Sequence, residues 1–222
     1  MEKKSRNSAL LSAIINEYIK TAKPVSSGVI VDNYGFDCSP ATIRNEMVVL
    51  EEQGYIESPH TSAGRVPTQQ GWQLYIAEFL ENEDISSEEQ VELKKDLKLD
   101  NLKNTAKKLG NISELTVFIG FSEHDTYFTG LANLFKQPEF QEIDLVQSIS
   151  QVVEHLEEMM PKIKKVLNNE TKVLIGAENP FGADSGVVAT EINKVLVGIL
   201  GPVRMDYQKN IARLNFIKEL LI

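Results

Sequence analysis

The chain has 222 residues, of which 42% are hydrophobic and 25% charged, a composition typical of a globular protein with one large or two ordinary domains. It contains no run of about 18 uncharged apolar residues, so we expect a cytoplasmic protein that does not bind a membrane. The single cysteine, Cys38, excludes an internal disulfide, and three scattered histidines provide no cluster of zinc ligands, so we expect neither a metal nor another cofactor.

The net charge of −9 is unevenly distributed along the chain. Residues 1–80 contain seven Lys or Arg and nine Asp or Glu, whereas residues 81–222 contain 16 and 23. Most of the negative charge therefore lies in the C-terminal part. The N-terminal part is still not basic, so DNA binding there would depend on a few placed cations, on backbone donors and on a dimer that doubles the contacts.

Three helices are predicted in the first 53 residues. Residues 8–20 have an apolar stripe at helical spacing, and a short second helix lies within 26–34. A third helix begins with Ser39 as N-cap and Pro40 in its first turn, and it runs to about Gln53.

A short hairpin is predicted directly after the third helix. Tyr55 and Ile56 form its first strand, the polar loop holds Pro59, and the chain returns at Val66. Three helices followed by a hairpin are typical of a winged helix-turn-helix, in which the hairpin is the wing. We therefore predict a DNA-binding domain of this type over residues 1–81.

The remainder of the chain is predicted to be an α/β domain behind a linker. Residues 82–98 are charged and helix-forming but have no strong apolar face, so they are taken as the linker. Beyond it, over residues 99–222, strand-like runs occur at 115–121, 126–132, 172–177 and 195–202, and helical stretches at 144–167 and 207–221. An antiparallel or mixed sheet would accommodate them, and the fold class of the whole chain is α+β.

The exposed face of the third helix is the candidate DNA-reading surface. Ile43, Met47 and Leu50 recur at helical spacing and form its buried stripe. In the major groove, Asn can pair with adenine, Arg with guanine, and small apolar groups can contact thymine methyls. Together with the N-cap, the candidates on this face are Ser39, Ala41, Thr42, Arg44, Asn45 and Val48.

The hairpin adds candidates for the DNA backbone. Arg65 can hold a phosphate or enter the minor groove, and Thr61 and Ser62 can bind the sugar-phosphate chain. His60 is either a DNA contact or a residue that stabilises the turn. The alternative is that these side chains are ordinary solvent-facing residues, but the helix-turn-helix and hairpin context favours DNA binding.

The segment ATIRNEMVVLEEQGYIESPHTSAGRVPTQQGW, residues 41–72, resembles the signature of the heat-inducible transcription repressor family HrcA. KVLIGAENP at 172–180 and GILGPVRMDY at 198–207 resemble the closing strands of that family's GAF-like regulatory domain. The resemblance implies a homodimer that binds an inverted-repeat operator ahead of chaperone genes and is kept active by the GroE chaperonin. Family members are usually longer, so a shortened GAF-like domain is expected here, without the inserted element associated with dimer formation.

Two further expectations concern assembly and the C-terminal part. The helix at 72–80 and a face of the α/β domain are the predicted dimer surfaces, and Arg204 and Asp206 are expected to pair at a turn rather than bind a ligand. No catalytic pairing or phosphate-binding glycine loop occurs at a usable spacing, so the chain is not predicted to be an enzyme.

Two alternatives to the repressor remain open. The chain could be a ligand-sensing winged-helix regulator whose α/β domain binds a small metabolite. It could also be a protein-interaction module whose winged helix no longer binds DNA.

Overall fold

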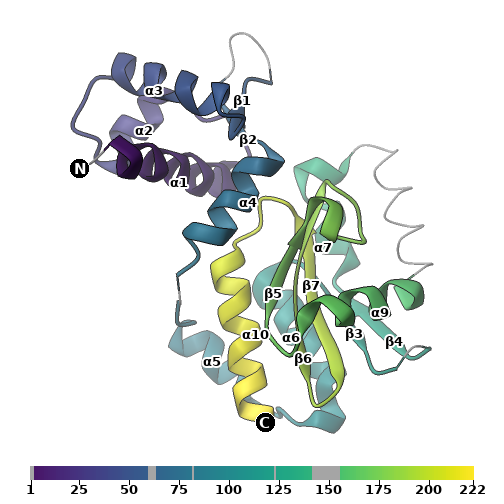
Figure 1. Cartoon of the computed structure of the whole chain (residues 1–222). Coiled ribbons are helices and arrows are strands. Elements are labelled where there is room, and N and C mark those ends of the chain that lie inside the picture. The colour runs from purple at the N-terminus through teal and green to yellow at the C-terminus, as the bar shows by residue number, and fades with distance from the viewer. Residues whose placement is uncertain (1–2, 60–63, 82, 123, 142–155) are drawn as a thin grey trace. The chain divides into compact units, whose positions relative to one another are not determined.

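The computed structural model of the chain describes residues 3–59, 64–81, 83–122, 124–141 and 156–222 (Figure 1). The chain divides into two compact units, Met1–Leu80 and Glu81–Ile222, which we name the N-terminal and C-terminal units. Among the described residues, no helix is both long and apolar enough to cross a membrane.

The N-terminal unit combines helices with a small antiparallel sheet. Its elements are α1 (Lys3–Thr21), α2 (Ser27–Tyr34), α3 (Pro40–Glu52), β1 (Ile56–Glu57), β2 (Val66–Pro67) and α4 (Gln69–Glu78). The three helices and the hairpin strands expected from the sequence are therefore present, and a fourth helix follows them.

Local sequence explains where three of these helices begin. The hydroxyls of Ser26, Ser39 and Thr68 each accept a hydrogen bond from the backbone amide three residues later, at 3.4, 3.2 and 3.1 Å. Such a bond satisfies one of the amides that a helix N-terminus leaves without a partner. Gly35 ends α2 in the left-handed region, with a φ of 66°, which glycine adopts without a Cβ clash.

The core of the N-terminal unit forms where α1 meets the other helices. Trp72 and Tyr75 of α4 are each only 3% exposed, and the Trp72 ring centroid lies 6.4 Å from that of Tyr18 on α1. The other most deeply buried side chains of this core are Leu10, Leu11, Ile14, Ile15, Ile30, Ile43, Leu50 and Ile56. The α4 face that carries Trp72 and Tyr75 thus packs inside the unit, and that face is not available as the dimer surface expected at 72–80.

The C-terminal unit is built on a five-stranded sheet. Its elements are α5 (Ser87–Lys94), α6 (Leu102–Ser113), β3 (Thr116–Gly120), β4 (Thr126–Thr129), α7 (Leu131–Phe135), α9 (Leu156–Leu167), β5 (Lys172–Ile175), β6 (Ser185–Ile192), β7 (Val195–Pro202) and α10 (Tyr207–Leu221), with short 3-10 turns at Leu99–Asn101, Pro138–Gln141 and Gly176–Glu178. The strand order is β4-β3-β7-β6-β5, and every neighbouring pair is antiparallel. This resolves the choice between an antiparallel and a mixed sheet for the described strands.

Helices cover both faces of the sheet (Figure 1). Side chains alternate between faces along a strand, and β6 shows which helix lies on which side. Val187 and Ala189 join the apolar cluster under α9. Thr190 lies on the opposite face, where its Oγ1 accepts a hydrogen bond from the Lys218 Nζ of α10 at 3.3 Å.

The structure differs from the sequence expectation in several places within this unit. Helix α6 was not predicted, and α7 begins inside the strand expected at 126–132. Strand β6 was not predicted because SGVVATEI mixes small, polar and charged residues, yet it is almost wholly buried between β5 and β7. The segment expected as a linker at 82–98 contains α5, which is held to the unit by Leu93 at 0% exposure and by an ion pair between Glu89 and Arg213. Residues 144–155 of the expected helix at 144–167 lie outside the described residues.

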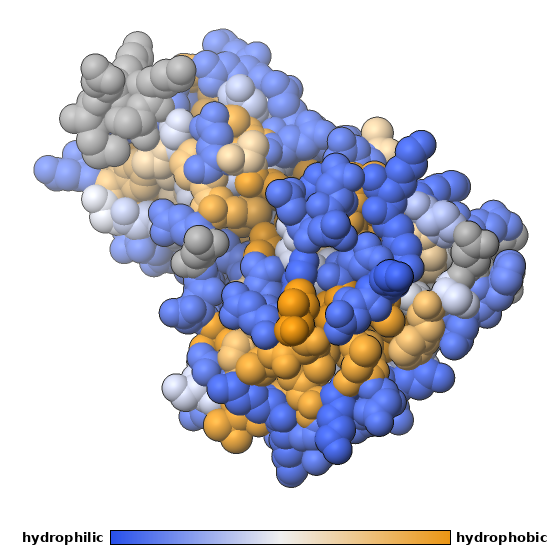
Figure 2. All heavy atoms as spheres, turned by 60° about the horizontal axis from the view of Figure 1, so that its bottom comes forward, coloured by the Kyte–Doolittle hydropathy of each residue, from blue (hydrophilic) through white to orange (hydrophobic). Residues whose placement is uncertain are grey.

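On the face that Figure 2 shows, hydrophilic residues are spread widely and hydrophobic residues are gathered in places. In the C-terminal unit, three of the exposed large hydrophobic residues lie on α5 or at the C-terminus. They are Val91 at 70%, Leu220 at 45% and Ile222 at 81% exposure.

Candidate nucleic-acid interface

Helix α3 is held in the N-terminal unit by one face and exposes the other. Ile43, Met47 and Leu50 are 0%, 4% and 2% exposed, so the buried stripe predicted from the sequence is confirmed. Ser39 fixes the start of the helix, and its hydroxyl also lies 3.0 Å from the hydroxyl of Thr42. These two candidate residues are thus partly committed to the helix cap.

The exposed face of α3 contains the candidate base-reading residues. Ala41, Thr42, Arg44 and Asn45 are exposed, and Val48 is 40% exposed. Within the described part of the chain, neither the Arg44 side chain nor the Asn45 side chain forms a hydrogen bond or an ion pair. Their polar groups are therefore available to a partner, on consecutive residues in the N-terminal half of the helix.

Acidic residues on α3 are largely neutralised by cations from other elements. The helix carries Glu46, Glu51 and Glu52 against the single cation Arg44. Arg6 Nε of α1 lies 2.9 Å from Glu46 Oε1, and Arg65 pairs with Glu51. These pairs leave Glu52, at the C-terminal end, as the acid without an ion-pair partner among the described residues.

Arg65 is fixed more tightly than a cation at the tip of a wing would be. Its Nε donates a hydrogen bond to Glu51 Oε2 at 3.0 Å, and its Nη2 lies 2.9 Å from the same oxygen in an ion pair. Its backbone amide and carbonyl are bonded to the carbonyl and amide of Val25, both at 2.8 Å. The guanidinium predicted to be free for DNA is thus engaged within the unit, and its side chain is 21% exposed.

Two glycines permit the close packing at the base of the hairpin. A Cβ on Gly64 would lie 2.3 Å from the carbonyl oxygen of Val25, and a Cβ on Gly71 would lie 2.1 Å from that of Tyr55. Thr68 also stabilises the base of the hairpin, since its hydroxyl donates a hydrogen bond to the Gly54 carbonyl at 2.6 Å. The sequence motif suggested no role for Thr68 or Gly71, and the N-cap spacing from Thr68 to Gly71 is the signal that could have revealed one.

Three candidates come from the loop between the hairpin strands. His60, Thr61 and Ser62 lie outside the described residues. The described interface therefore consists of the exposed α3 face and Arg65.

A different ion pair from the expected one stabilises the C-terminal unit. Arg204 binds Glu139 and donates to Gln137 Oε1 at 2.8 Å, whereas Asp206 accepts a hydrogen bond from the Lys209 amide at 3.1 Å. The predicted pairing of Arg204 with Asp206 is wrong, because Asp206 serves as the N-cap of α10. Its carboxylate is directed to the helix N-terminus, where free amides favour it.

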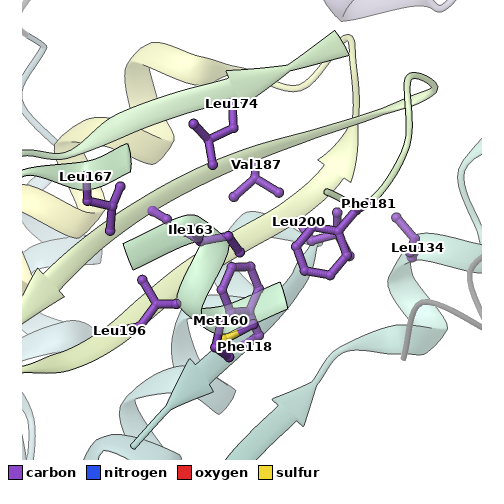
Figure 3. Packing of buried hydrophobic residues seen from close by; sticks show 11 residues of the cluster. Phe118, Leu134, Met160, Ile163, Leu167, Leu174, Phe181, Val187, Leu196 and Leu200 are labelled. Carbon is purple, nitrogen blue, oxygen red and sulfur yellow. The ribbon is translucent and has the colours of Figure 1, made fainter. Parts of the chain in front are cut away.

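The sheet face under α9 is filled by apolar side chains (Figure 3). The ring centroid of Phe118 lies 6.0 Å from that of Phe128 and 5.5 Å from that of Phe181. Gly198 makes room for Phe118, since a Cβ there would lie 2.1 Å from the ring. This face is packed as a core, and the described residues contain no group of metal-ligand side chains.

More than half of the chain matches a known protein family. The sequence model described as HrcA protein C terminal domain matches residues 72–211. This chain belongs to the HrcA family. HrcA proteins are heat-inducible transcription repressors and not enzymes.

HrcA relatives extend the similarity to the N-terminal unit. The heat-inducible transcription repressor HrcA of Carboxydothermus hydrogenoformans is 27% identical over 329 aligned positions, which cover 97% of this chain and 96% of the relative. Because 329 positions exceed the 222 residues of this chain, that alignment must pass over gaps in it. The HrcA of Desulforudis audaxviator is 44% identical over 116 residues, but this match covers only 51% of this chain and 34% of the relative.

A solved structure shares the fold. A crystal structure of a hypothetical protein matches with a TM-score of 0.81 at 21% identity, covering 97% of this HrcA chain and 96% of the other.

Proposed function

We propose that this HrcA chain is a sequence-specific DNA-binding repressor of chaperone genes, with a winged helix-turn-helix in residues 1–81. The observation that carries the proposal is the α3 face on which Arg44 and Asn45 lie exposed and without partners among the described residues. These side chain types read guanine and adenine edges, and the exposed Val48 suits a thymine methyl.

The charge order along α3 supports entry of the helix by its N-terminal half. Arg44 and Asn45 lie in that half, whereas Glu51 and Glu52 lie at the other end. The helix N-terminus also carries the positive end of the backbone dipole, which favours phosphate. Docking in this orientation places the attractive groups at the DNA and the repulsive ones away from it.

A two-fold dimer and an inverted-repeat operator follow from the same electrostatics. With seven Lys or Arg against nine Asp or Glu in residues 1–80, one unit offers few phosphate contacts. Two N-terminal units on one operator would double the phosphate contacts, and each unit of the dimer would bind one of the two half-sites. The exposed Val91, Leu220 and Ile222 are the apolar groups that we assign to contact between copies.

We propose the remaining family properties for the C-terminal unit. Residues 99–222 would form a shortened GAF-like regulatory domain through which the GroE chaperonin keeps the cytoplasmic repressor active. Support comes from the match of the HrcA C-terminal family model to residues 72–211 and from the antiparallel sheet with helices on both faces. Addition of purified GroE should then raise the fraction of chain that binds operator.

The central test is binding of the full chain to DNA from upstream of chaperone genes in its own genome. Fluorescence anisotropy should show that a fragment with an inverted repeat binds more tightly than a scrambled fragment of equal length. Asn45→Ala should reduce this preference, and Gln73→Ala, an exposed change on α4, is the matched control that should not. Equal affinity for both fragments would contradict the proposal.

A further inference from the structure

We infer that Glu51 restrains DNA binding, because its carboxylate holds Arg65 on α3 and a DNA phosphate must displace that carboxylate to reach the cation. The inference rests on the proposed DNA-binding function and adds to it a residue that acts without contacting a base.

The geometry at Arg65 leaves the side chain two possible partners. Two hydrogen bonds to Val25, both at 2.8 Å, fix its backbone, and the close approach of Gly64 to the Val25 carbonyl prevents an easy shift. The guanidinium can therefore leave Glu51 by side-chain rotation but not by movement of the chain. At 2.9 and 3.0 Å it makes two charge-assisted contacts with one carboxylate oxygen.

A phosphate must compete with this carboxylate for Arg65. In a nonspecific complex the protein meets phosphates at variable positions, so few of them can replace a fixed partner at hydrogen-bond distance. In an operator complex the base contacts of α3 fix the phosphates relative to the hairpin, so a phosphate can replace Glu51 there. The energy of the ion pair between Glu51 and Arg65 is lost in that exchange, so Glu51 lowers operator affinity, and on random DNA it keeps Arg65 from adding a phosphate contact.

Glu51→Gln tests the inference, because glutamine keeps the size of the side chain and removes its charge. Exposed ion pairs are weak, so affinity for random DNA should rise by about fivefold. The slope of log affinity against log salt should steepen by about 0.9 on random DNA, as expected for one additional phosphate contact. Operator affinity should rise by at least as much, because the ion pair no longer has to be broken, whereas the salt slope on the operator should stay unchanged, since Arg65 already contacts a phosphate there.

Glu52→Gln is the matched control. It removes one negative charge from the next position of the same helix, and Glu52 has no ion-pair partner among the described residues. General electrostatics would raise affinity equally in both variants, so only the excess of Glu51→Gln over Glu52→Gln reports a released Arg65. In an Arg65→Ala background that excess should disappear.

The outcomes separate this inference from the proposed function. If the unaltered chain prefers its operator but Glu51→Gln behaves like Glu52→Gln in affinity and salt slope, the inference is wrong and the proposed function stands. If the unaltered chain shows no operator preference, both are overturned. Glu51→Ala, which retains high helix propensity, should reproduce the excess and shows that it does not depend on the amide of glutamine.

Discussion

Replacing Gly64 with alanine should destabilise the N-terminal unit by about 2 to 3 kcal/mol, since two backbone hydrogen bonds are worth about 1 kcal/mol each and strain adds to their loss. The added Cβ would lie 2.3 Å from the Val25 carbonyl oxygen, 2.4 Å from its carbon and 2.8 Å from the Pro24 carbonyl carbon. All three neighbours are backbone atoms, so the clash cannot be relieved by turning a side chain. The hairpin must move away from Val25, and both hydrogen bonds between Val25 and Arg65 must lengthen or break.

Trp72 provides an assay that reports on this unit alone. It is the only tryptophan of the chain, and at 3% exposure it lies in the core of the N-terminal unit. Urea unfolding followed by its fluorescence should show a lower midpoint with little change in slope for Gly64→Ala. The same variant should lose operator affinity, because the displaced hairpin and α3 no longer present their DNA contacts in one fixed arrangement.

Gly28→Ala is the control for this prediction. In α2 the nearest atom to an added Cβ is Ser26 Oγ at 3.9 Å, an ordinary contact. Alanine there should leave the N-terminal unit unchanged or stabilise it by up to about 1 kcal/mol, because it restricts the unfolded chain. A Gly64→Ala protein with the same urea midpoint as the unaltered chain would refute the steric argument.

Three further predictions concern DNA binding. Arg44→Ala and Asn45→Ala should each weaken operator binding by about 1 to 3 kcal/mol and relax the base preference at one position in each half-site. Unchanged DNA footprints in both variants would show that α3 does not read the groove. Arg65→Ala should lower operator affinity and reduce the salt slope on the operator by about one unit, since it removes a phosphate contact and leaves Glu51 unpaired, whereas the slope on random DNA, where Glu51 holds Arg65, should change little. A loss confined to one base pair would contradict a backbone role. The chain should sediment as a dimer at micromolar concentration and bind a full inverted repeat about 10² to 10⁴ times more tightly than a half-site. A monomer that binds the full repeat and the half-site with equal affinity would exclude the dimer.

Several contacts of the candidate site lay beyond sequence reasoning. Arg65 was expected to be free because it is the only cation of the hairpin, but its partner Glu51 lies 14 residues earlier on another element. Arg204 was expected to pair with its near neighbour Asp206, but it pairs with Glu139, 65 residues away. Ion pairs between distant segments depend on how those segments pack, which charge counts along the chain do not reveal.

What the sequence by itself determined is the local structure of α3 and its surroundings. Ser39 and Pro40 specify where the helix begins, and the spacing of Ile43, Met47 and Leu50 specifies which face is buried, because both effects act within a few residues. The tertiary structure alone decided that SGVVATEI is an interior strand, that α5 packs on Arg213, and that Arg65 is bonded to Glu51. These outcomes depend on burial and charge pairing between segments far apart in the chain, where packing overrides local preference.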